Sequence, residues 1–155
     1  MTAKYTVLGD TTLATSSASV TFSSIPSGYK DLVLVADYAP AGASVGCNFR
    51  LNSDLGSNYY TVLMQGNGST AGSYSSGPDD RTVNWSAGAG LKIFNIMDYT
   101  ATDKHKTALA RENQGGSVVA YAYRWASTSA VSSIEILGTG GSYAIGSTFR
   151  LLGVN

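Results

Sequence analysis

Residues 118–125 alternate strictly between two kinds of side chain. A β-strand points successive side chains to opposite faces, so one face here carries large apolar groups (Val119, Tyr121, Tyr123 and Trp125). The other face carries smaller groups and one arginine (Val118, Ala120, Ala122 and Arg124). Aromatic side chains at a period of two suit a pleated sheet. The segment therefore predicts a strand with one buried face.

Strand patterns recur along the rest of the chain. Gly/Ser/Asn-rich segments separate further candidate strands at 19–22, 31–37, 46–51, 59–65, 81–85, 91–99, 106–112, 132–137 and 148–154. Residues 31–37 are continuously apolar between two aspartates, which predicts a central strand covered on both faces. Residues 106–112 would tolerate a helix, and we interpret them as a strand. About nine or ten strands result, with no helix longer than two turns.

This number of short strands predicts an all-β, jelly-roll-like β-sandwich, because a single open sheet of that size would expose one apolar face. A lipocalin-like barrel fits less well, because its long hairpins lack the alternation of short strands with long loops. We expect loops at 66–78 and 138–146. The chain of 155 residues is long enough for one domain, 1–155, to bury roughly 70% of its unfolded-state surface.

The charge composition bears on possible partners. Ten basic residues balance ten acidic ones, and charged residues make up 13% of the chain, about half the average of roughly 25% for globular proteins. No local cluster of Lys or Arg provides the positive charge that nucleic-acid binding needs. No apolar run approaches the roughly 20 residues of a membrane span, and no signal peptide opens the chain. We expect neither nucleic acid nor a membrane as a partner, and no export signal.

The inventory of reactive side chains is small. His105 is the only histidine and lies between two lysines in a polar turn, and Cys47 is the only cysteine, in a predicted strand. A zinc site or a serine-protease-like triad lacks its residues, so we expect no cofactor, no metal and no enzyme. Two alternatives stay open: calcium at Asp79 and Asp80, and a glycosidase pair of carboxylates. Glu112 and Glu135 are placed on the polar faces of their strands.

Tyrosine is abundant, with ten residues in the chain. Four of them fall in or beside Gly/Ser/Asn-rich segments: Tyr59, Tyr60, Tyr74 and Tyr143. Tyrosine gives a large contact area at a low cost in conformational entropy, so this composition is typical of binding surfaces. These four are the candidate residues for contact with a partner or a glycan. The alternative is that they cap sheet edges with their hydroxyl groups in water.

Two segments carry a resemblance to a known group of proteins. Residues 19–35 and the closing stretches 125–137 and 146–154 are similar to the opening and closing segments of structural proteins of tailed bacteriophages, and Asn52, Tyr59-Tyr60 and residues 96–99 are similar in kind between them. The resemblance implies a jelly-roll protein of the virion, either a head decoration (cement) protein or a domain of a fibre. No catalytic or ligand residue belongs to the shared pattern.

The leading hypothesis is therefore a capsid decoration protein, made in the host cytoplasm and located on the capsid surface. Its partners would be the major capsid protein and copies of itself, in a homotrimer. The alternative is a receptor- or carbohydrate-binding module of a fibre or tail. A small hydrolase is the weakest hypothesis, given the inventory of reactive side chains.

Overall fold

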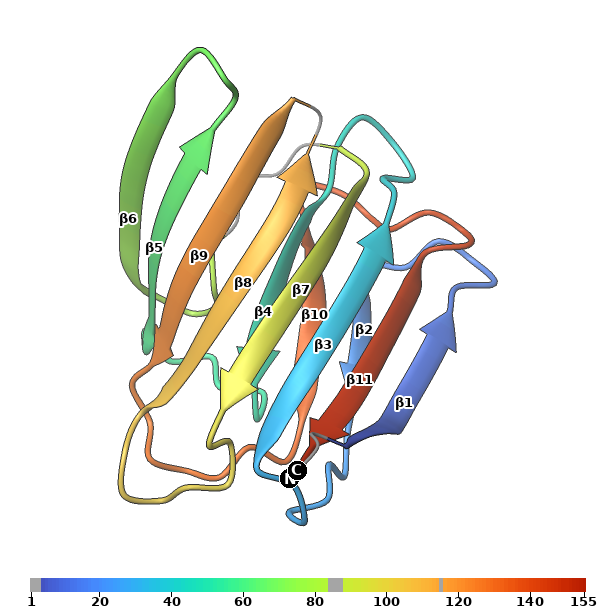
Figure 1. Cartoon of the computed structure of the whole chain (residues 1–155). Helices are drawn as coiled ribbons and strands as arrows, with labels where there is room; N and C mark the ends of the chain where they lie inside the picture. Colours follow the sequence, from blue (N-terminus) through green and yellow to red (C-terminus); the bar gives the residue numbers. More distant parts are fainter. Residues whose placement is uncertain (1–3, 84–87, 115) are drawn as a thin grey trace.

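The computed structural model describes residues 4–83, 88–114 and 116–155, and these residues form eleven strands and no helix. In chain order the strands are β1 (Tyr5–Thr12), β2 (Ser19–Phe22), β3 (Asp31–Tyr38), β4 (Gly46–Leu51), β5 (Tyr59–Gly66), β6 (Ala71–Asp79), β7 (Gly90–Met97), β8 (Lys106–Gln114), β9 (Ser117–Trp125), β10 (Ile134–Thr139) and β11 (Thr148–Val154) (Figure 1). The all-β prediction is confirmed. No described helix is long and apolar enough to cross a membrane.

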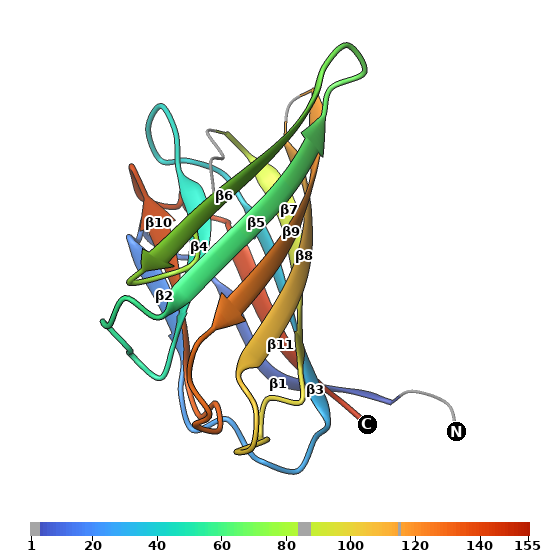
Figure 2. The ribbon, with the colours of Figure 1, turned by 90° about the vertical axis from the view of Figure 1, so that its left-hand side faces the viewer.

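The strands form two antiparallel sheets of unequal width. One has eight strands in the order β1-β11-β3-β7-β8-β9-β5-β6, and the other has three in the order β2-β10-β4. Figure 2 shows the narrow sheet on one side and the wide sheet on the other, as in a β-sandwich. Strands β3, β9, β10 and β11 alternate between buried and more exposed side chains, and their apolar side chains point into the space between the sheets.

Aromatic rings from both sheets meet in this core. Phe49 of β4 makes edge-to-face contacts with Phe94 of β7 and Tyr123 of β9, with ring centroids 5.2 and 5.4 Å apart. This geometry is favourable for aromatic pairs and adds to the gain from burying their area. Phe49 and Phe94 are 2% and 0% exposed. The predicted buried face of residues 118–125 is confirmed by the burial of Val119, Tyr121, Tyr123 and Trp125.

Strand β4 lies at an edge of the narrow sheet and is nevertheless buried along its whole length. The chain that follows β6 covers it: the Thr82 amide donates to the Phe49 carbonyl at 3.1 Å, and the Phe49 amide donates to Thr82 Oγ1 at 2.8 Å. An uncovered edge would leave these backbone groups unpaired. Residues 81–83, predicted as the start of a strand, lie outside the regular strands, and 84–85 fall outside the described residues.

Three further expectations need correction. Strand β1 lacks clear alternation in the sequence and was not predicted; it pairs with β11 through a bulge near Gly9. The segment 66–78, expected as a loop, contains most of β6, because its small polar residues pair with β5 at the sheet edge. Strand β3 is central, as predicted, but Val33 and Val35 on its outer face are only half-buried, because none of the described strands packs on that side.

The closing segment forms β10 and β11, which lie in different sheets. β11 lies between β1 and β3, with Phe149 opposite Ala36, and its inward side chains Phe149 and Leu151 are 0% and 1% exposed. The Phe149 ring contacts Tyr143 edge-on, with centroids 4.9 Å apart. The last strand is therefore part of the core.

We predict that Phe149→Ala lowers the free energy of unfolding by about 3–5 kcal/mol, because it removes a buried ring and leaves a cavity. Urea denaturation followed by fluorescence measures the loss. Leu152→Ala, on the half-buried face of the same strand, is the matched control and should cost less. A loss below about 1 kcal/mol for Phe149→Ala would contradict the core position.

Candidate functional site

The outward face of the wide sheet is the most distinctive surface of the molecule. Strand pairing aligns its residues in rows across five strands. One row consists of Met64, Ala120, Arg111, Ile93 and Val35, and the next consists of Val62, Ala122, Leu109, Asn95 and Val33. Several of these apolar side chains are well exposed, Met64 at 63% and Leu109 at 52%. We call the outward residues of β5, β9, β8 and β7 the apolar face.

Charge is nearly absent from the apolar face. Among the outward positions of these four described strands, Arg111 and Arg124 are the charged residues, and none is acidic. The guanidinium of Arg124 lies over the Tyr60 ring, 4.1 Å from its centroid, which covers part of the ring. The face is thus apolar with a weak positive charge.

A shallow hollow of about 240 Å³ marks the end of the apolar face near the β8–β9 turn. Leu91, Ile93 and Val118 supply its apolar walls, and Arg111, Glu112 and Asn113 complete the lining. Val118 is 69% exposed. Exposed apolar patches rimmed by polar groups mark interaction sites on proteins of this size. The hollow and the rows beside it form the candidate interaction surface.

Two of the four tyrosines proposed for contact lie in the core, which corrects their assignment. Tyr59 and Tyr143 are both 0% exposed. The Tyr59 hydroxyl accepts from the Leu51 amide at 2.9 Å and donates to the Leu51 carbonyl at 3.2 Å. Burial raises the pKa of both tyrosines above the usual value. The glycines and serines near both tyrosines made the sequence look like a loop. In the structure Tyr59 occupies an inward position of β5, and the backbone of Tyr143 forms isolated β-bridges with Ser17 and Pro40, so both side chains lie in the core.

The other two tyrosines are on the surface. Tyr60 is 36% exposed and belongs to the apolar face, where it contacts Arg124. Tyr74 is 44% exposed and lies on β6, opposite Leu63 of β5. The structure therefore separates them: Tyr60 points to the outer side of the wide sheet and Tyr74 shares the inner side with Leu63. They do not form one site.

A charged cluster in the core was missed by the sequence analysis. Lys92 and Glu112 lie opposite each other on β7 and β8 and are 0% and 2% exposed, with Nζ 3.5 Å from Oε2. Tyr121 donates to Glu112 Oε2 at 2.8 Å, and the Tyr38 hydroxyl donates to Oε1. Glu112 was placed on a polar face; that placement is wrong, because it shares the inward phase of Ala108 and Ala110.

Lys92 is enclosed as fully as its partner. Its ammonium donates to the Cys47 carbonyl at 3.2 Å and lies 3.9 Å from the Tyr121 ring centroid. Burial lowers the pKa of Lys92, although the Glu112 carboxylate opposes that effect. The phase of Lys92 with Phe94 and Ile96 was the signal available in the sequence, since all three occupy alternate positions of one strand.

The remaining reactive groups are dispersed. His105 is exposed in its turn, and Cys47 is 0% exposed, with burial raising its pKa from 9.0 to about 12. Asp80, considered as a calcium ligand, is ion-paired through its two carboxylate oxygens with Arg50 and Arg81, at 3.1 and 2.9 Å. Within the described residues no three His, Cys, Asp or Glu side chains are grouped to hold a metal ion.

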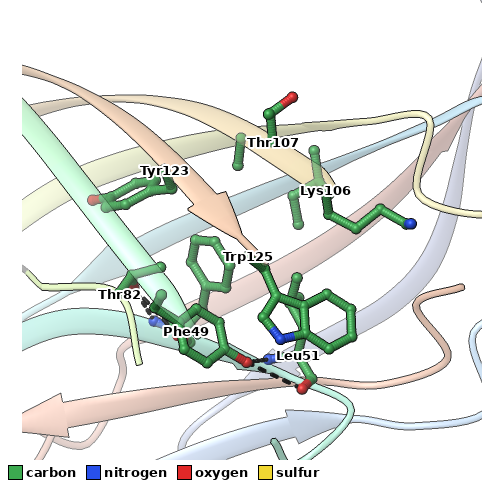
Figure 3. Close-up of a pocket in the computed structure, with 10 residues that line it drawn as sticks. Phe49, Leu51, Thr82, Lys106, Thr107, Tyr123 and Trp125 are labelled. Carbon is green, nitrogen blue, oxygen red and sulfur yellow. Dashed lines mark hydrogen bonds between the residues drawn. The ribbon is translucent and has the colours of Figure 1, made fainter. Parts of the chain in front are cut away.

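The core also contains a small cavity between the sheets. Figure 3 shows Phe49, Tyr123 and Trp125 around it, with the Lys106 ammonium extending away. Its volume is about 10 Å³, which is the space of one water molecule at most. Lys106 donates to the carbonyls of Ala101, Lys104 and Thr128, so it fastens the neighbouring loops. The cavity is a packing gap.

No protein-family model matches this chain. No curated protein matches it either. The surfaces and clusters of the molecule are therefore the basis for its proposed function.

We predict that Glu112→Gln lowers the free energy of unfolding by about 3–5 kcal/mol, because it leaves the Lys92 ammonium buried without a counter-charge. The double variant Lys92→Met/Glu112→Gln should recover most of that loss, since a methionine fills the space with no charge. Urea denaturation of the four proteins in the mutant cycle measures the coupling.

Glu135→Gln is the matched control for this cycle, because Glu135 is a partly exposed carboxylate, 3.0 Å from Arg50. It should cost about 1 kcal/mol or less. Equal losses for the two Glu→Gln variants would show that Glu112 does not balance a buried charge.

Proposed function

We propose that this chain is a structural protein of a tailed-bacteriophage virion, a jelly-roll decoration protein that binds the outer surface of the capsid and stabilises the head. The observation that carries the proposal is the apolar face: a broad sheet surface with exposed Leu109, Met64 and Val118 and only two charged side chains. An exposed apolar surface of this kind is typical of a site that contacts a partner. Docking to a shell would bury it.

The sequence resemblance supplies the kind of partner, and the chemistry of the face supports it. The major capsid protein would provide an apolar surface, with acidic or polar groups near Arg111 and Arg124. Copies of this chain in a homotrimer are the second partner in the proposal. A net charge of zero and few charged residues weaken repulsion between copies packed closely on a shell.

The proposed stabilisation is cumulative. Each bound copy adds buried area across a joint between capsid subunits, and binding to the assembled shell alone shifts the equilibrium toward that shell. The symmetry of the head repeats the contact many times. No catalytic step belongs to the proposal, which agrees with the enclosure of Lys92 and Glu112 in the core.

Copy number in purified particles is the direct test. We expect this chain at a stoichiometry near that of the shell subunit, measured by quantitative mass spectrometry of purified virions. Particles without it should release their DNA at a lower temperature than complete particles. A handful of copies per particle would contradict decoration and indicate a fibre or tail role instead.

We further predict that Leu109→Glu reduces binding to undecorated capsids by at least about tenfold, because it places an uncompensated charge in a dry contact. Ile145→Glu is the matched control: Ile145 is equally apolar and 69% exposed, and it lies in the loop between β10 and β11. Co-sedimentation with capsids measures both, and urea denaturation verifies that both variants fold. Equal binding by the two variants would exclude the apolar face as the contact.

A further inference from the structure

The wide sheet extends beyond the narrow one at its β5–β6 end. β6 is the edge strand, and Figure 2 shows the tip of the β5–β6 hairpin projecting away from the sheet formed by β2, β10 and β4. Tyr74 lies opposite Leu63, so its side chain is on the inner side of the sheet. Leu63 is 2% exposed and Tyr74 is 44% exposed. The inner side therefore passes from core to open surface along this hairpin.

A hollow of about 280 Å³ lies at this open end. The side chains and backbone around it are uncharged and come from the hairpin and the start of β9: Gln65, Asn67, Thr70, Gly72, Tyr74 and Ser117. An ionic ligand would find no counter-charge among them, and burying its charge there would be costly. A neutral, polar ligand fits this lining.

The Tyr74 ring lies close to the backbone of its own strand. It leans over Gly72, two residues earlier on the same face, and a Cβ at Gly72 would lie 3.1 Å from Tyr74 Cε2. Glycine at this position thus lets the ring approach the strand and leaves an aromatic surface beside the hollow. A tyrosine ring has few rotatable bonds, so a ligand that stacks on it costs little conformational entropy.

The hairpin turn fixes a second polar group. Asn67 Oδ1 accepts hydrogen bonds from the Ser69 and Thr70 amides at 3.0 and 2.7 Å and from Thr70 Oγ1 at 3.1 Å. This closed turn orients the amide of Asn67. Among the described residues none accepts a hydrogen bond from its Nδ2, so two donors remain for a ligand.

We propose that this hollow is a binding site for a neutral carbohydrate, which adds a ligand-binding function to the proposed structural one. The C–H face of one sugar ring stacks on Tyr74, and sugar hydroxyl groups exchange hydrogen bonds with Asn67 and Gln65. The volume lies just below the range of about 300–1,000 Å³ for small-molecule sites, which suits one sugar residue of a longer glycan.

The test begins with the full chain on an array of neutral oligosaccharides, followed by calorimetric titration of a glycan that binds. We expect Tyr74→Ala to weaken binding by at least tenfold and Tyr74→Phe to keep most of it, because the ring provides the stacking surface. Gln65→Ala should weaken binding by a smaller factor. Circular dichroism and urea denaturation verify that each variant folds.

Tyr60→Ala is the matched control, since Tyr60 is a similarly exposed tyrosine on the opposite side of the sheet. It should leave glycan binding unchanged. No signal from any neutral glycan would overturn the proposal, as would an equal loss in Tyr60→Ala and Tyr74→Ala. Capsid co-sedimentation of Tyr74→Ala separates the two functions, because this variant should still bind capsids.

Discussion

The unequal width of the two sheets is the constraint on which this structure depends. Three strands must cover the inner side of eight, so the narrow sheet concentrates its apolar side chains where the wide sheet is centred. Phe49 of β4 contacts rings from β7 and β9 at once. Strand β4 is buried along its whole length, and the chain around Thr82 covers its edge by hydrogen-bonding to the Phe49 backbone. The ends of the wide sheet extend beyond the narrow sheet and lie at the surface.

The Lys92–Glu112 ion pair is stable in the core because several further groups contact it, and these contacts offset the free energy of desolvation. Lys92 has the Cys47 carbonyl and the Tyr121 ring, and Glu112 has two tyrosine hydroxyl groups in addition to the ammonium. An ion pair without such partners would not repay its desolvation. Four strands, β3, β4, β7 and β9, contribute these groups around β8. The hydrogen bond from Lys92 to the Cys47 carbonyl therefore links the wide sheet to the narrow one.

The apolar face and the hollow at the β5–β6 hairpin lie on opposite sides of the wide sheet. Its outer side carries the apolar face across β5, β9, β8 and β7, which suits contact with a large partner, and charged residues such as Arg150 and Asp10 follow on β11 and β1. Its inner side emerges at the β5–β6 hairpin as a small polar hollow with one aromatic ring. The proposed capsid contact and the proposed carbohydrate site use these two sides, and Tyr60 and Tyr74 mark them. Separate locations allow both contacts at the same time.

The sequence predicted most of the strands and the buried face of the strongly alternating ones, because a period of two fixes which side chains share a face, but it did not predict β1 or β6. It also contained the phase of Lys92 and Glu112, although their charge outweighed that signal in the interpretation. The pairing of the strands could not be predicted, since it joins residues far apart in the chain and depends on how the whole chain packs. That pairing buried Tyr59 and Tyr143, exposed Tyr60 and Tyr74 on opposite sides, and left the outer face of β3 uncovered.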